Sequence, residues 1–184
     1  MPAKLFYTGP SLGTLHEEYA KKSRIDEQAP LISVASITIE APGPAVWAVI
    51  SDVAGWPAWY PEFTVLDLGE VRPGAPMRWK LGGLTMRSTF AVVTAGRELT
   101  WSGRFFGYKA VDQHLLEPAG NGRTTVTMRE SLAGPLLTLF YRPNQLRAGH
   151  QRWLTALKTT LERRWPTNGA GPTNGAGHTP RRSS

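Results

Sequence analysis

Two side chains suited to proton transfer, Asp112 and His114, stand two positions apart in a strand-like segment near the middle of the chain. Side chains in a β-strand alternate between its faces, so this pair shares one face with Tyr108 and apolar Leu116. If Leu116 faces the core, the pair faces it too, and a buried carboxylate can orient an imidazole near neutral pH. We therefore take His114, Asp112 and Tyr108 as candidate catalytic residues that could enolise a ketone or remove water.

This assignment depends on the strand register, because a shift of one residue would turn Asp112 and His114 to solvent. On the next strand, the same alternation points Glu130 inward. Alternatively, Glu130 forms a surface ion pair with an arginine such as Arg129, Arg104 or Arg87. His150 lies in an apolar helical stripe, where a hydrogen-bonded core histidine is the more common role.

Aromatic and apolar side chains expected on the inner faces of these segments would form the wall of a binding cavity. The candidate ligand-binding residues are Trp101, Phe90, Phe105, Met86, Met128, Glu130, His150 and Trp153. Trp47, Trp56 and Trp59 are instead expected to pack in the core or in a lid. Seven tryptophans still leave ample wall for a flat, apolar ligand.

Motifs for other chemistries are missing from the sequence. It contains no phosphate loop, nucleophile elbow or HExxH motif, and its lack of cysteine excludes disulfides and thiolate chemistry. The two candidate histidines and two carboxylates do not have the spacing typical of zinc ligands, so we expect no metal. We expect no diffusible cofactor either.

The elements that must position these residues begin with a β-branched, alternating strand at 33–40, which Ala41-Pro42-Gly43-Pro44 ends. Short helical pieces are expected at 45–51 and 56–62. Turn signals every 10–14 residues then predict an antiparallel meander of five or six strands. A helix over 136–164, interrupted by Pro143, places Leu146, His150, Trp153, Leu157 and Leu161 on one face.

Three parts are expected: an extension at 1–30 with a short helix near 15–27, a main domain at 31–165, and a flexible Gly/Pro/Asn-rich tail at 166–184. Thr14 and Glu17 have capping-box spacing, and Asp52 is expected to cap the helical piece after it.

The net charge of +7 comes from scattered residues, so nucleic acid is not expected as a partner. Without a signal peptide or membrane span, we expect a cytoplasmic protein; the sequence leaves a homodimer open.

The string ITIEAPGPAVWAVISDVAGWPAWYP, followed by LTWSG at 99–103 and HLLEP at 114–118, resembles the SRPBCC superfamily. This superfamily has the START or birch-pollen-allergen-like helix-grip fold, and the resemblance is to its polyketide cyclase/dehydrase-like branch. The match covers roughly residues 32–163. It implies an α+β fold in which a curved antiparallel sheet of about seven strands wraps around a long C-terminal helix and encloses an apolar cavity.

The resemblance also implies a function, namely acid/base-catalysed cyclisation or dehydration of a hydrophobic secondary-metabolite intermediate. The superfamily is functionally diverse, so the fold does not decide between this activity and a non-catalytic carrier or sensor of an apolar ligand. A third interpretation is an interaction module that uses the helix within residues 1–30. A small hydrophobic ligand is the expected partner in the first two.

Overall fold

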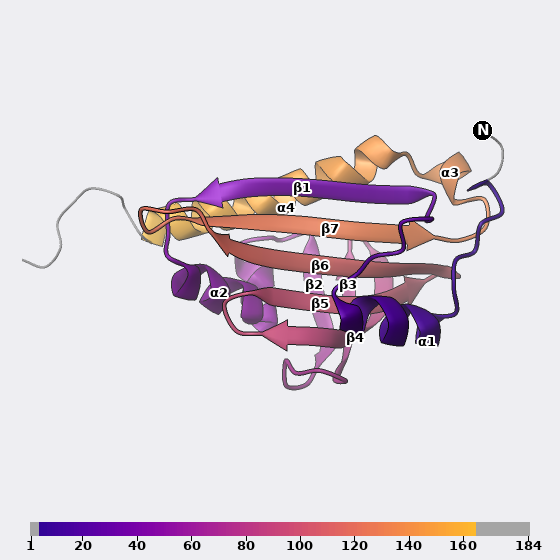
Figure 1. Ribbon diagram of the computed structural model, residues 1–184, viewed down its shortest axis with the longest axis horizontal. Helices are drawn as coiled ribbons and strands as arrows, with labels where there is room; N and C mark the ends of the chain where they lie inside the picture. The colour runs from indigo at the N-terminus through magenta and orange to yellow at the C-terminus, as the bar shows by residue number, and fades with distance from the viewer. Residues whose placement is uncertain (1–3, 165–184) are drawn as a thin grey trace, which may run out of the picture.

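A computed structural model of the protein describes residues 4–164. Seven antiparallel strands form one sheet in the order β1-β7-β6-β5-β4-β3-β2 (Figure 1). The strands are β1 (Leu31–Ile39), β2 (Phe63–Leu68), β3 (Pro76–Leu81), β4 (Leu84–Thr94), β5 (Glu98–Phe105), β6 (Tyr108–Pro118) and β7 (Thr124–Ala133). The helix-grip fold expected from the sequence is thereby confirmed.

Helices fill the rest of this architecture. Between β1 and β2 come α2 (Gly43–Ser51) and the 3₁₀ helix η4 (Val53–Ala58), and after β7 come α3 (Leu137–Phe140) and α4 (Pro143–Arg164). Pro44 lies in the first turn of α2, where its missing N–H costs no hydrogen bond. The second helical piece begins and ends earlier than the predicted 56–62, because the Asp52 side chain accepts a hydrogen bond from Gly55 N–H and starts η4 there.

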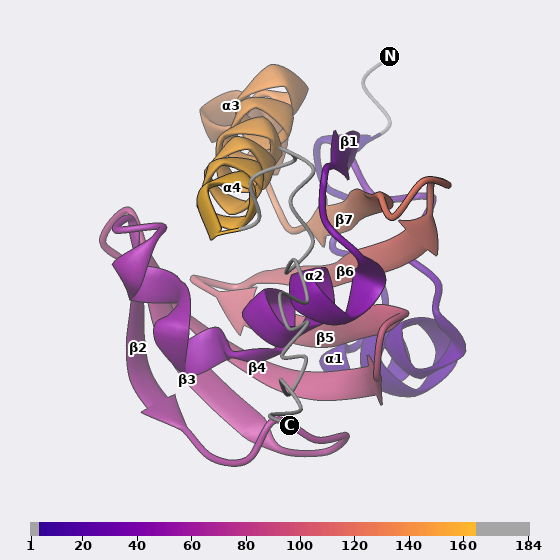
Figure 2. The same ribbon diagram turned by 90° about the vertical axis from the view of Figure 1, so that its left-hand side faces the viewer.

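The long helix α4 packs on the concave face of the sheet and lies between β1 and the curled strands β2 and β3 (Figure 2). The predicted apolar face is correct: Leu146, His150, Trp153, Leu157 and Leu161 are all buried. Irregular pairing at Val65/Asp67 in β2 and at Phe90/Val92 in β4 accompanies the bend of the sheet around this helix. None of the helices described is long and apolar enough to cross a membrane.

The N-terminal segment covers the convex face of the sheet. Its helical part runs from Leu12 to Lys22 as α1 (Leu12–Thr14), a π-helical turn η2 (Leu15–Tyr19) and a 3₁₀ turn η3 (Ala20–Lys22). It begins before the predicted 15–27 because Ser11, and not Thr14, accepts the capping hydrogen bond, and it ends at Ser23, whose φ is +53°. Leu15 and Ile25 are buried against Ala91 and Val111 of the sheet.

The proposed boundaries at 30/31 and 165/166 stay predictions. The tail expected from Pro166 onward lies outside the described residues.

Candidate functional site

A cavity of about 280 Å³ lies between α4 and the concave face of the sheet. This volume is near the lower end of the roughly 300–1,000 Å³ typical of small-molecule sites. Strands β3 to β7, the η4 region and α4 all contribute to its wall. The lining residues are Trp56, Tyr60, Glu62, Phe63, Trp79, Leu81, Gly82, Leu84, Met86, Ser88, Trp101, Gly103, Arg104, Phe105, Ala110, Asp112, His114, Met128, Glu130, Leu132, Tyr141, Leu146, Gly149, His150, Arg152 and Trp153.

Aromatic rings form one side of this cavity. The His114 ring stacks on Trp101 with centroids 4.9 Å apart and meets the edge of Trp153 at 4.6 Å. Trp56 lies 5.3 Å from Trp153 and 6.0 Å from Trp101, which joins the η4, sheet and α4 contributions into one cluster. Such flat, rigid walls suit an aromatic or polyene ligand.

Two carboxyl groups face each other on the cavity floor. Asp112 of β6 and Glu130 of β7 are directly opposite cross-strand partners, and Nε2 of His150 on α4 lies 2.9 Å from Glu130 Oε2. Oxygen and nitrogen atoms of all three side chains come within 4.8 Å of one another. This arrangement brings together residues that are far apart in the sequence.

The environment shifts the pKa of Asp112 and of His150. Burial raises the pKa of Asp112 well above its ordinary value, and the neighbouring charge of Glu130 raises it further, although His150 opposes the shift. Burial by itself lowers the pKa of His150, but the hydrogen bond and charge of Glu130 and the charge of Asp112 outweigh it, so the pKa is raised. The arrangement therefore favours a protonated Asp112 beside a Glu130–His150 ion pair.

His114 has a different environment. It is 1% exposed, and burial followed by the positive charge of His150 lowers its pKa to about 3. Its Nδ1 lies 3.5 Å from Asp112 Oδ1, and neither ring nitrogen has a hydrogen-bond partner among the residues described. His114 is thus neutral at physiological pH and contributes an aromatic surface to the cavity wall.

The structure brings most of the sequence-predicted site residues to the cavity wall. Asp112, His114, Trp101, Phe105, Met86, Met128, Glu130, His150 and Trp153 all line it. Glu130 pairs with His150 instead of with a surface arginine.

Two predicted residues do not line the cavity. Tyr108 lies at the strand end, where its ring is 5.4 Å from Phe105 and fills the space beside Gly134. Phe90 is 0% exposed behind Trp101, with its ring 6.3 Å away at an angle of 84°. The alternation of the strand placed Tyr108 on the inner face correctly, but the cavity does not extend to Tyr108 or to Phe90.

Several lining residues were missed. Tyr60 is buried and Tyr141 is partly buried, and burial is the main cause that raises the pKa of both phenols. Arg152 Nε lies 3.5 Å from Glu62 Oε1 in an exposed ion pair. The alternation of Met77, Trp79 and Leu81 in β3 could have identified Trp79. Tyr60 and Tyr141 lie in loops, and Arg152 is an exposed charged residue of α4, so no apolar pattern marks them.

Among the described residues, Asp112, Glu130 and His150 are the group with the donor types and proximity for a metal ion. Two carboxylates and one imidazole suit several divalent cations. The His150–Glu130 hydrogen bond uses two of these donors, so a metal would have to displace it.

Comparison with known proteins places this fold in a family. Residues 31–174 match the family model described as "Polyketide cyclase / dehydrase and lipid transport". The chain belongs to this family. The match begins at the first strand of the sheet, so it includes both the cavity and the helix that covers it. A comparison with curated protein sequences gave no match.

Solved structures with this fold include a hypothetical protein of Helicobacter pylori, with 16% identity and a TM-score of 0.64 over 76% of this chain and 93% of that one. DynU16, a protein in the dynemicin biosynthetic locus, has 22% identity and a TM-score of 0.59 over 71% of this chain and 47% of that one. CalU16 of Micromonospora echinospora has 18% identity and a TM-score of 0.54 over 71% and 75%. At these identities the likeness shows the fold alone.

Proposed function

We propose that this protein is a cavity enzyme that cyclises or dehydrates a hydrophobic, oxygenated secondary-metabolite intermediate by acid/base catalysis. The observation that carries the proposal is the pair of facing carboxyl groups, Asp112 and Glu130, beneath His150 in an otherwise aromatic and aliphatic cavity. Groups whose environments push their proton affinities apart are a common basis for acid and base roles.

In a dehydration, the Glu130 carboxylate takes a proton from the carbon next to a ketone, and Asp112 gives its proton to the departing hydroxyl group. A carbon–carbon double bond forms and water leaves. The two carboxyl groups then exchange one proton across the strand pair, which restores the starting state. The reaction needs no oxidant, reductant or covalent intermediate.

In this proposal His114, the sequence-predicted catalyst, stays a member of the site. With a pKa of about 3 it is a weak base at neutral pH. We assign it to the aromatic wall, where a free nitrogen beside Asp112 can hold the carboxyl group or a ligand oxygen in place.

Support for a substrate of secondary metabolism comes from the family description and from DynU16, which has this fold and lies in a biosynthetic locus. The family description includes lipid transport too, so a carrier is the second candidate, and the largely apolar wall favours it. The cytoplasmic location and the homodimer stay predictions.

The test measures binding and turnover separately. Aromatic β-hydroxy ketones are mixed with the full-length protein, ligand binding is followed by quenching of the cavity tryptophans, and the conjugated enone is followed by its absorbance. Asp112→Asn should retain binding but reduce turnover at least about 100-fold, the usual contribution of a positioned acid. Glu117→Gln, a matched carboxylate removal at an exposed position of the same strand, should change neither.

The outcomes separate the two candidates. Tight binding by the parent protein without turnover of any compound would favour the carrier. Turnover that survives in both Asp112→Asn and Glu130→Gln would refute the assigned catalytic residues.

A further inference from the structure

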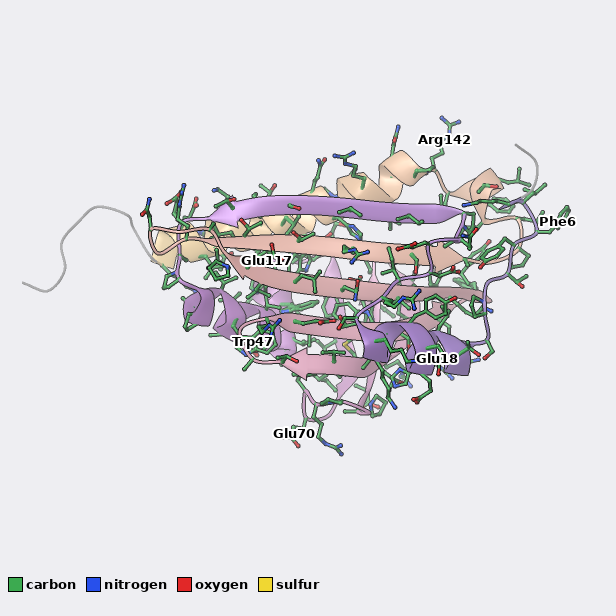
Figure 3. All side chains as sticks on the ribbon, in the orientation of Figure 1. Phe6, Glu18, Trp47, Glu70, Glu117 and Arg142 are labelled. Atoms are coloured by element: carbon green, nitrogen blue, oxygen red, sulfur yellow. The ribbon has the colours of Figure 1, made fainter. Side chains whose placement is uncertain are left out.

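Large apolar side chains are exposed at one end of the molecule, which we call the hairpin end. Phe106 is 82% exposed, Phe6 and Phe140 are 73% exposed, and Leu139 is 64% exposed. Among residues 4–164, no other large apolar side chain is more than half exposed. They come from the β5–β6 turn, the N-terminal segment and α3, which lie at the same end in Figure 1, and Phe6 projects outward there in Figure 3.

The sequence neighbours of two of these exposed side chains line the cavity. Phe105 lines the cavity and Phe106 follows it; Tyr141 lines the cavity and Phe140 precedes it. Leu84, at the β3–β4 turn, both lines the cavity and is 39% exposed. A hydrogen bond of 2.8 Å from Leu136 N–H to the Leu5 carbonyl ties the N-terminal segment to α3.

Phe106 also occupies an unfavourable backbone conformation. Its φ is +45° and that of Gly107 is +85°, in a tight hairpin turn where Asn-Gly is the favoured pair. A bulky side chain at positive φ is strained, and Phe106 buries little in return.

Basic side chains stand just behind the hairpin tips. Arg78, Arg87 and Arg104 are direct cross-strand neighbours on β3, β4 and β5, and all three are exposed. None of them forms an ion pair with another described residue, and like charges directly opposite each other are destabilising. Arg142, next to Tyr141, adds a further unpaired cation and projects from the surface in Figure 3.

Arg104 lies close behind the Phe106 tip along its strand. Arg104 is two residues from Phe106, a separation of about 6–7 Å along a strand. Apolar groups of peripheral proteins enter the boundary between headgroups and acyl chains by about 5–10 Å. With the tips at that depth, the arginines would lie near the lipid phosphates.

We propose that the hairpin end docks on an anionic lipid bilayer, with Phe106, Phe140 and Phe6 inserted and the arginines at the phosphate level. Protruding, separate aromatic tips surrounded by cations suit a fluid interface better than the close-packed surface of a protein partner. Docking would bring the cavity mouth against the membrane, which gives an apolar ligand a route that avoids water. This inference stands independently of the acid/base proposal.

The experiment is co-sedimentation of the full-length protein with vesicles of phosphatidylcholine alone or with 30 mol% phosphatidylglycerol, at low and high salt. We expect binding to the anionic vesicles that weakens as salt screens the charges. Arg104→Gln/Arg142→Gln should weaken it on the order of fivefold for each cation removed. Phe106→Ser/Phe140→Ser should weaken it at least about tenfold.

Two control variants replace an apolar residue and an arginine away from the hairpin end. Val34→Ser changes an exposed apolar residue in the middle of β1, and Arg97→Gln removes a cation from the β4–β5 turn. Both should bind like the parent, and circular dichroism of every variant checks that it is folded. Lack of binding to anionic vesicles at low salt, or equal binding by the control and hairpin-end variants, would overturn the proposal. So would binding of an acidic protein, but not vesicles, through the same residues.

Discussion

Replacing Asp112 with Asn should make the protein more stable at neutral pH while it removes the proposed acid. Asp112 is 9% exposed, its Oδ1 has no hydrogen-bond partner among the described residues, and the Glu130 carboxylate faces it across the strand pair. At pH 7 folding must return a proton to this group, which costs at most about 1.4 kcal/mol for each pH unit between its ordinary pKa and the raised one. An amide has the same shape and is uncharged without binding a proton, so it avoids this cost. We therefore expect Asp112→Asn to raise the free energy of unfolding by about 1–3 kcal/mol at pH 7.

The pH dependence follows from the raised pKa of Asp112. In the folded protein this group keeps a proton at pH values where the unfolded chain has already lost it. The unfolded state then binds fewer protons, so the contribution of Asp112 to stability falls as pH rises from its ordinary pKa to the raised one. The slope cannot exceed about 1.4 kcal/mol per pH unit. The advantage of Asp112→Asn should consequently be greatest at pH 7 and shrink toward pH 4.

Urea denaturation followed by tryptophan fluorescence at pH 4 and pH 7 measures both effects. A gain of 1 kcal/mol corresponds to about 2–4 °C in Tm for a chain of this size. Glu117→Gln, an exposed carboxylate on the same strand, should stay within about 0.5 kcal/mol at both pH values. A loss of stability in Asp112→Asn at pH 7, or the same gain at pH 4 and pH 7, would show that Asp112 does not hold a proton in the folded state.

Three further changes test the packing and charge of the structure. Trp153→Ala should cost about 3–5 kcal/mol in urea denaturation, because this ring is 4% exposed and packs against His114 and Trp56; a change below 0.5 kcal/mol would contradict its burial. His114→Phe should reduce the loss of unfolding free energy at pH 4.5 by about 2–3 kcal/mol. The folded-state pKa of His114 is about 3, so the unfolded chain binds the proton first as pH falls below 6.5. Parallel curves of stability against pH for parent and variant would refute this. Leu15→Ala should cost about 2–5 kcal/mol, since Leu15 is 1% exposed against the convex face, and unchanged stability would mean that the N-terminal segment detaches readily.

Much of the sheet could be predicted from the sequence because strand alternation is a strict rule. Apolar Leu116 in the core fixes Asp112 and His114 on the same face, and the same period orients Glu130. The helical period likewise places His150 and Trp153 on the buried face of α4. These local patterns needed no knowledge of tertiary contacts.

The limits of the cavity could not be predicted in this way. Periodicity orients Phe90 and Tyr108 inward, but it does not show where neighbouring rings fill the space, as Trp101 does for Phe90. The pairing of Glu130 with His150 depends on the position of α4 along the sheet, which no local pattern encodes. Tyr141 reaches the wall only because the chain between α3 and α4 folds over the strand ends.

The position of the carboxyl groups along the strands bears on how a substrate would lie. On β6 and β7 the facing pair Asp112–Glu130 lies between Ala110–Leu132 toward the hairpin end and His114–Met128 toward the tryptophan cluster. A ligand that entered from the hairpin end would place its leading apolar rings against the His114 and Trp101 rings, with its oxygenated segment at the carboxyl groups behind them. Burial raises the pKa of Asp112, so the same burial that suits an apolar ligand would favour the proton on the proposed acid. The proposed chemistry would therefore act behind the leading rings of a bound molecule.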